Sequence, residues 1–173
     1  MTVVIPTLET ERLWLRPFKD ADHDAVADFF TNDPGARYVG GPTDRRGAWR
    51  VIATFIGHWH LRGFGPFAIE DKATAQWLGW CNLWRPPEFP EIEIGWTLAE
   101  RHRGKGYVHE AAVRVRDYAF DTLRLPTLVS YIVPENTTSR RVAERLGAKH
   151  ETSIDMRKVL VDVWRHPRTG GTA

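Results

Sequence analysis

The segment from Arg101 to Gly106 has the residue types of a loop that binds a phosphate group. It reads Arg-His-Arg-Gly-Lys-Gly and lies between a strand pattern and a helix pattern. The first backbone N–H groups of a helix lack partners within the helix, so they can bind an anion. Gly104 and Gly106 would let a bulky anion approach, and Arg103 and Lys105 would add positive charge unless they belong to a solvated loop.

Two familiar phosphate loops do not fit this segment. A P-loop needs Ser or Thr after Gly-Lys and a glycine six residues before the lysine, but these positions hold Gly106 and Ala99. A dinucleotide-binding turn would need glycine where the chain has His109. The loop therefore predicts a different phosphate-containing ligand.

The run just before this loop, residues 91–98, alternates apolar and other side chains as a half-buried strand does. One face would pack in the core, and it comprises Ile92, Ile94, Trp96 and Leu98. The other face would be available for chemistry, and it comprises Glu91, Glu93, Gly95 and Thr97.

The apolar pattern predicts the elements that position these residues. Strands are expected at residues 12–18, 67–70, 77–84, 91–98, 127–133 and 158–164. Helices are expected at 25–30, at 44–61, at 108–123 and between Asn136 and Gly147, with a loop near 151–157.

Length and composition predict one soluble domain. The chain has 173 residues, of which 42% are hydrophobic and 27% charged, in the range of compact globular proteins. We expect a single domain over 1–173, with its core at about 8–165 and a flexible tail at 167–173. The single cysteine, Cys81, lies in an apolar run and predicts a buried thiol and a reducing, cytoplasmic location.

Charge and hydropathy argue against several classes of protein. The net charge of +2 gives no general attraction for nucleic acid, although eight tryptophans and clustered arginines leave that class as an alternative. No apolar run reaches the roughly 18 residues of a membrane span. With one cysteine the chain has no cysteine-based zinc site, and we expect no metal.

Three further motifs accompany the loop in matching order. They are Leu8-Glu9-Thr10-Glu11-Arg12-Leu13-x-Leu15-Arg16, Glu93-Ile94-Gly95-Trp96, and Asn136-x-x-Ser139-x-Arg141-Val142-Ala143-Glu144-x-Leu146-Gly147. Together with Arg101-x-x-Gly104-x-Gly106, they resemble the GNAT superfamily of acetyl-coenzyme A-dependent N-acetyltransferases. The branch they resemble is that of the ribosomal-protein N-terminal (RimJ/RimL-like) acetyltransferases, and the likeness covers about residues 8–165.

The resemblance implies an α/β (α+β) fold and a cosubstrate. GNAT proteins have a mixed, strongly twisted sheet of six or seven strands, flanked here by about four helices. The fourth and fifth strands, here 91–98 and 127–133, splay apart and admit the pantetheine arm of acetyl-coenzyme A. The order of strands and helices expected above agrees with this fold.

The resemblance also implies which residues bind the cofactor. Backbone groups of Trp96, Thr97 and Leu98 would bond the carbonyl and pantetheine, and the 101–106 loop would bind the pyrophosphate. Asn136 would bond the pantetheine amides, unless it only caps the following helix. The full expected set is Trp96, Thr97, Leu98, Arg101, Arg103, Gly104, Lys105, Gly106, Tyr107, Asn136, Ser139 and Arg141.

Acyl transfer to an amine needs a proton acceptor and a proton donor for the departing thiolate. Glu93 and Glu91 are candidate bases, and Glu93 is preferred because it belongs to the family motif; either could instead be a structural carboxylate. The tyrosine that donates the proton in many GNAT enzymes is replaced by Ala143. Ser139, or a water it orients, is then the candidate acid, with a capping hydroxyl as the alternative.

The sequence leaves the acceptor open. The expected activity is transfer of an acetyl group to a protein N-terminal amine or a small-molecule amine, by direct attack in a ternary complex. An acyl-coenzyme A-binding module without turnover is the alternative. Residues 35–65 and 151–157 are expected to shape the acceptor pocket, and a homodimer is possible by resemblance.

Overall fold

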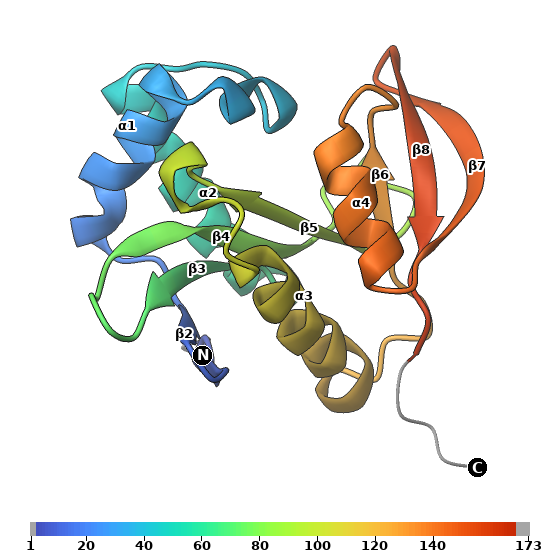
Figure 1. The fold of residues 1–173 in the computed structure, drawn as a ribbon, viewed down its shortest axis with the longest axis horizontal. Helices are drawn as coiled ribbons and strands as arrows, with labels where there is room; N and C mark the ends of the chain where they lie inside the picture. The colour runs from blue at the N-terminus through green and yellow to red at the C-terminus, as the bar shows by residue number, and fades with distance from the viewer. Residues whose placement is uncertain (1–2, 169–173) are drawn as a thin grey trace.

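The computed structural model describes residues 3–168, and they build one eight-stranded mixed sheet (Figure 1). Its strands lie in the order β1-β2-β3-β4-β5-β6-β8-β7. Their bounds are β1 Leu8–Glu9, β2 Leu13–Arg16, β3 Pro66–Asp71, β4 Trp77–Trp84, β5 Glu93–Leu98, β6 Val129–Ile132, β7 Lys149–Met156 and β8 Val159–Arg165. All neighbouring strands are antiparallel except β5 and β6.

In the described part of the chain four α-helices flank the sheet, as expected: α1 His23–Asn32, α2 Arg45–Arg62, α3 Tyr107–Asp117 and α4 Thr137–Arg145. Asp44 begins α2 because its side chain accepts a hydrogen bond from the Gly47 N–H. Gly63, with φ of 76°, ends it in the left-handed conformation that favours glycine. The long helix expected at 108–123 is α3 followed by a π-helical turn, Tyr118–Thr122.

Successive residues of the central strands pack on opposite faces of the sheet. On β3, Ile69 belongs to the cluster beneath α3, with Ala111 and Val115. Its neighbour Ala68 belongs to the other cluster, with Phe29 of α1 and Trp80 of β4. The alternation follows from the two-residue period of a strand. It places α1 and α2 on the face of the central strands opposite to α3.

β5 and β6 separate almost as soon as they meet. Their register contains one aligned pair, Glu93 with Val129. Beyond Glu93, the β6-facing edge of β5 has no strand partner within residues 3–168, so the splay expected from the resemblance is present. This gap is the feature that positions the candidate site.

The sheet has one or two more strands than expected, and two segments explain the difference. The two-residue β1 pairs with β2, and β7 takes most of the segment 151–157, where we expected a loop. Because β7 is an edge strand whose side chains are almost all exposed, it lacks the alternation of apolar and polar residues from which a strand is predicted. β5 also begins at Glu93, two residues later than expected.

The predicted tail 167–173 lies mostly outside the described residues. Within residues 3–168, no helix is long and apolar enough to cross a membrane. Cys81 is fully buried in β4, as expected.

Candidate active site

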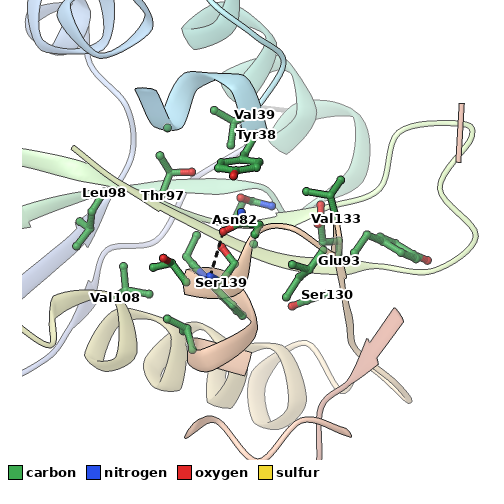
Figure 2. Close-up of a pocket in the computed structure, with 18 of the residues that line it drawn as sticks. Tyr38, Val39, Asn82, Glu93, Thr97, Leu98, Val108, Ser130, Val133 and Ser139 are labelled. Carbon is green, nitrogen blue, oxygen red and sulfur yellow. Dashed lines mark hydrogen bonds between the residues drawn. The ribbon is translucent and has the colours of Figure 1, made fainter. Parts of the chain in front are cut away.

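A cleft of about 960 Å³ opens where β5 and β6 separate (Figure 2). Its walls come from β4, β5 and β6, from the N-terminal turns of α3 and α4, and from the segment 34–40 that follows α1, with further residues from α2 and the β7–β8 hairpin. Residues that the sequence separates by about 100 positions therefore meet at one opening.

The glycine-rich loop reaches the cleft through its backbone. Gly104 and Gly106 have φ of 79° and 80°, in the left-handed region that other residues rarely adopt. Among the described residues, no protein group accepts a hydrogen bond from the backbone N–H groups of residues 104–109. Arg12 supports the loop from outside by donating to the Lys105 carbonyl oxygen, 3.0 Å away. The start of α3 thus offers free donors suited to a pyrophosphate.

The basic side chains of this loop do not all face the cleft. Arg101 and Lys105 are absent from its lining, and Arg101 turns back to Asp28 of α1, 3.1 Å away. Arg103 does line the cleft, but its guanidinium donates to the Leu98 carbonyl oxygen at 3.0 Å and to Asp33 at 2.8 Å. The geometry therefore favours backbone N–H groups over these side chains as ligands of an anion.

Asp33 connects the loop to the segment that carries Tyr38. One of its carboxylate oxygens accepts from Arg103 and from the Gly35 N–H, and the other accepts from the Glu100 N–H at 2.6 Å. A single side chain thus joins the segment 34–40 to the residues around the glycine-rich loop.

α4 closes the cleft on the other side of β5. The Asn136 side chain accepts from the Ser139 N–H, 3.2 Å away, and so caps this helix. Ser139 and Arg141 line the cleft, as do Trp96, Thr97, Leu98 and Tyr107. Among the described residues, the Ser139 hydroxyl makes no hydrogen bond. It is therefore available to a ligand and does not serve as a cap.

Glu93 lies at the base of the splay and lines the cleft (Figure 2). Desolvation by burial raises the pKa of its carboxyl to about 7, against a smaller opposing effect of a hydrogen bond from the Tyr131 backbone. A carboxylate whose pKa lies near neutral pH can both accept and release a proton there.

Glu91, the second candidate base, does not line the cleft. Arg165 binds its two oxygens with two hydrogen bonds of 2.9 Å. These hydrogen bonds lower the pKa of Glu91. The geometry gives Glu91 a structural role between β5 and β8.

Ala143, at the position of the usual tyrosine, is fully buried and packs against Ile132, Ala148 and Trp164. It does not line the cleft. Among residues 3–168, no group of three or more His, Cys, Asp and Glu side chains is arranged to hold a metal ion.

Sequence reasoning missed Asn82 and Tyr38, which both line the cleft (Figure 2). Tyr38 lies in the segment 35–65, where we did expect acceptor contacts. Asn82 had a signal that we did not use, because it is the one amide in the otherwise apolar run from Trp77 to Trp84. A polar residue in a buried strand needs an explanation.

Comparison with known proteins identifies the family. Residues 12–149 match the family described as the acetyltransferase (GNAT) domain, so the chain belongs to the GNAT acetyltransferases. The crystal structure of an acetyltransferase from Agrobacterium tumefaciens is 42% identical, with a TM-score of 0.86 over 97% of this chain and 98% of that one. The chain is thus an acyltransferase of a family that uses acetyl-coenzyme A.

Two curated sequences extend this result. An uncharacterized N-acetyltransferase, p20 of Bacillus licheniformis, is 30% identical over 91% of this chain and 93% of its own length. The ribosomal protein uS5-alanine N-acetyltransferase of Escherichia coli is 23% identical over 91% of this chain and 86% of its own length. The resemblance to the ribosomal-protein branch is therefore confirmed at the level of homology.

Proposed function

We propose that this protein transfers an acetyl group from acetyl-coenzyme A to a primary amine by direct attack in a ternary complex. The observation that carries the proposal is Glu93, a carboxylate with a pKa of about 7 at the cleft where β5 and β6 separate. The free N–H groups at the start of α3 support the binding of the donor's pyrophosphate.

Each step of the transfer has a candidate group. Glu93 takes a proton from the incoming ammonium, directly or through water, and the neutral amine forms the new C–N bond as the C–S bond breaks. Backbone N–H groups of Trp96 to Leu98 stabilise the negative charge that develops on the carbonyl oxygen. The Ser139 hydroxyl, or a water bound to it, gives a proton to the departing thiolate and regains one from the nitrogen, which loses its second proton as the amide forms.

The test is release of free thiol from acetyl-coenzyme A with a panel of amines and peptides, beside calorimetric binding of coenzyme A. We expect coenzyme A binding and amine-dependent thiol release that Glu93→Gln strongly reduces. Binding without turnover on any acceptor would instead support a cofactor-binding module. A cytoplasmic location and a homodimer remain predictions from the sequence and the resemblance.

A further inference from the structure

The side chain of Asn82 is buried without a partner. It is 9% exposed, and within residues 3–168 nothing hydrogen-bonds its amide. Two other buried polar side chains are paired, Asp22 with Arg16 and Ser130 with the Ile94 carbonyl oxygen, whereas the indole nitrogens of Trp77 and Trp164 are buried without a partner. Its amide atoms are not among the fully buried unpaired atoms of residues 3–168, so they keep contact with the solvent of the cleft. The Asn82 side chain reaches the cleft, where a ligand can pair with it.

Strand register places this amide beside Glu93. Asn82 pairs with Gly95, and the next pair on the same face is Trp84 with Glu93. A Cβ atom on Gly95 would lie 2.9 Å from both Nδ2 and Oδ1 of Asn82, so the amide lies over the bare backbone of Gly95. Figure 2 shows Tyr38 and Val39 on the other side of Asn82. The amide thus lies inside the half of the cleft opposite to α3.

Aromatic rings form much of this half of the cleft. Phe55 of α2 and Trp84 of β4 line it with ring centroids 5.7 Å apart. His58 stacks on Trp84 at 4.2 Å and holds that ring in place. These flat apolar surfaces suit a ligand with a flat apolar group.

Negative charge is sparse in the same space. Of the described residues that line the cleft, Glu93 and Glu135 are the carboxylates, whereas Arg37 and Arg157 lie among the cations. A polyamine carries several positive charges, and several carboxylates would be needed to replace the water that hydrates these charges in solution. The charge therefore favours an acceptor with a single amino group.

We propose that Asn82 positions the acceptor amine, and that the acceptor is a small primary monoamine with a flat apolar group. The Asn82 Oδ1 accepts one N–H of the neutral amine while Glu93 accepts the other, which directs the nitrogen lone pair toward the donor carbonyl. Tyr38, Phe55 and Trp84 contact the apolar group. This inference rests on the proposed function and names its substrate class.

The test compares Asn82→Ala with Cys81→Ala. Cys81 is the neighbouring residue on β4, and its side chain packs on the opposite face of the sheet, so it controls for disturbance of the strand. With 2-phenylethylamine as acceptor, we expect Asn82→Ala to raise the KM for the amine about tenfold or more, as loss of one charge-assisted or buried hydrogen bond does. Coenzyme A affinity by calorimetry should change less than twofold in both variants.

The acceptor class is tested on the wild-type protein. We expect kcat/KM for 2-phenylethylamine to exceed those for spermine and for an alanine-initiated octapeptide at least tenfold. A higher value for spermine or the peptide overturns the substrate class, and an unchanged KM in Asn82→Ala overturns the positioning role. If no acceptor releases thiol, the proposed function fails. Calorimetry of 2-phenylethylamine with the coenzyme A complex then decides the role of Asn82, because equal affinity in the wild type and Asn82→Ala refutes it.

Discussion

The Ser130 hydroxyl oxygen lies 2.6 Å from the carbonyl oxygen of Ile94, next to the point where β5 and β6 separate. Its single proton is donated to that carbonyl. The Nε2 atom of His166, 2.9 Å away, must therefore donate to Ser130. Burial lowers the pKa of His166 to about 4, so its ring is neutral at pH 7. These three groups form a brace that joins β5 and β6 where the strands separate. They replace the backbone hydrogen bonds that join neighbouring strands elsewhere in the sheet.

Removal of this brace should weaken both the fold and the donor site. Ser130→Ala leaves the Ile94 carbonyl and the His166 N–H unpaired in a buried place, which costs about 2 kcal/mol. For a chain of this size we expect Tm to fall by roughly 4–8 °C, with a higher KM for acetyl-coenzyme A. Scanning calorimetry and steady-state kinetics measure the two effects. Ser153→Ala on the edge strand β7 is the control, and an equal loss of donor affinity there would contradict the brace.

Because of Glu93, the plot of kcat/KM against pH should have a rising limb near neutral pH. Because the unprotonated carboxylate accepts the proton, and burial raises its pKa to about 7, kcat/KM should rise as pH increases through that value. Glu93→Gln should lower kcat about 100-fold or more and remove the limb. The ratio of wild-type to variant rates on one acceptor cancels the titration of the acceptor itself. A ratio that is constant from pH 5.5 to 8.5 would rule out Glu93 as the base.

Alanine substitutions at two glycines with nearly the same backbone conformation distinguish an effect of backbone strain from a loss of coenzyme A binding. Gly106 has φ of 80° and Gly63 has φ of 76°, and an alanine at either position costs on the order of 1 kcal/mol. We expect Gly106→Ala and Gly63→Ala to lower Tm by similar amounts. Only Gly106→Ala should also weaken coenzyme A binding, by about tenfold or more in calorimetry. A similar loss of affinity in Gly63→Ala would attribute the effect to general instability.

Ser139 should act in the chemical step if its hydroxyl supplies the thiolate proton. Since this hydroxyl makes no hydrogen bond within residues 3–168, Ser139→Ala should leave Tm within about 2 °C of the wild type. We expect kcat to fall at least tenfold and the KM for acetyl-coenzyme A to change little. Ser139→Thr retains a hydroxyl and should restore part of kcat. If kcat survives in Ser139→Ala, the proton comes from elsewhere.

Local patterns predicted most of the framework. A continuous apolar run located β4 residue by residue, and helical periodicity located α2. The glycines at 104 and 106 marked the start of α3, because few other residues tolerate that conformation. These local signals explain why the fold and the family could be predicted from the sequence, and the structure and the comparisons confirmed both.

Partners distant in the sequence could not be predicted. Arg103 meets Asp33, 70 residues away, and no pattern near either residue encodes that pair. Glu91 and Glu93 share one face in the sequence pattern, yet β5 begins at Glu93 and Arg165 binds Glu91. The polar β7 is held by its pairing with β8, so its own residues carry no periodic signal. Tertiary contacts decide all three.

Asp33 links the two sides of the cleft, and this link limits which segments can be exchanged in protein engineering. Its carboxylate holds Arg103 and Glu100 on the donor side and Gly35 at the start of the segment 34–40. A library that varies residues 36–40 to change acceptor choice can leave the donor loop intact, provided that Asp33 and Gly35 are kept. Grafting the whole segment from a relative that lacks this carboxylate would instead release the donor loop from its anchor. The boundary of an exchangeable module therefore falls after Gly35.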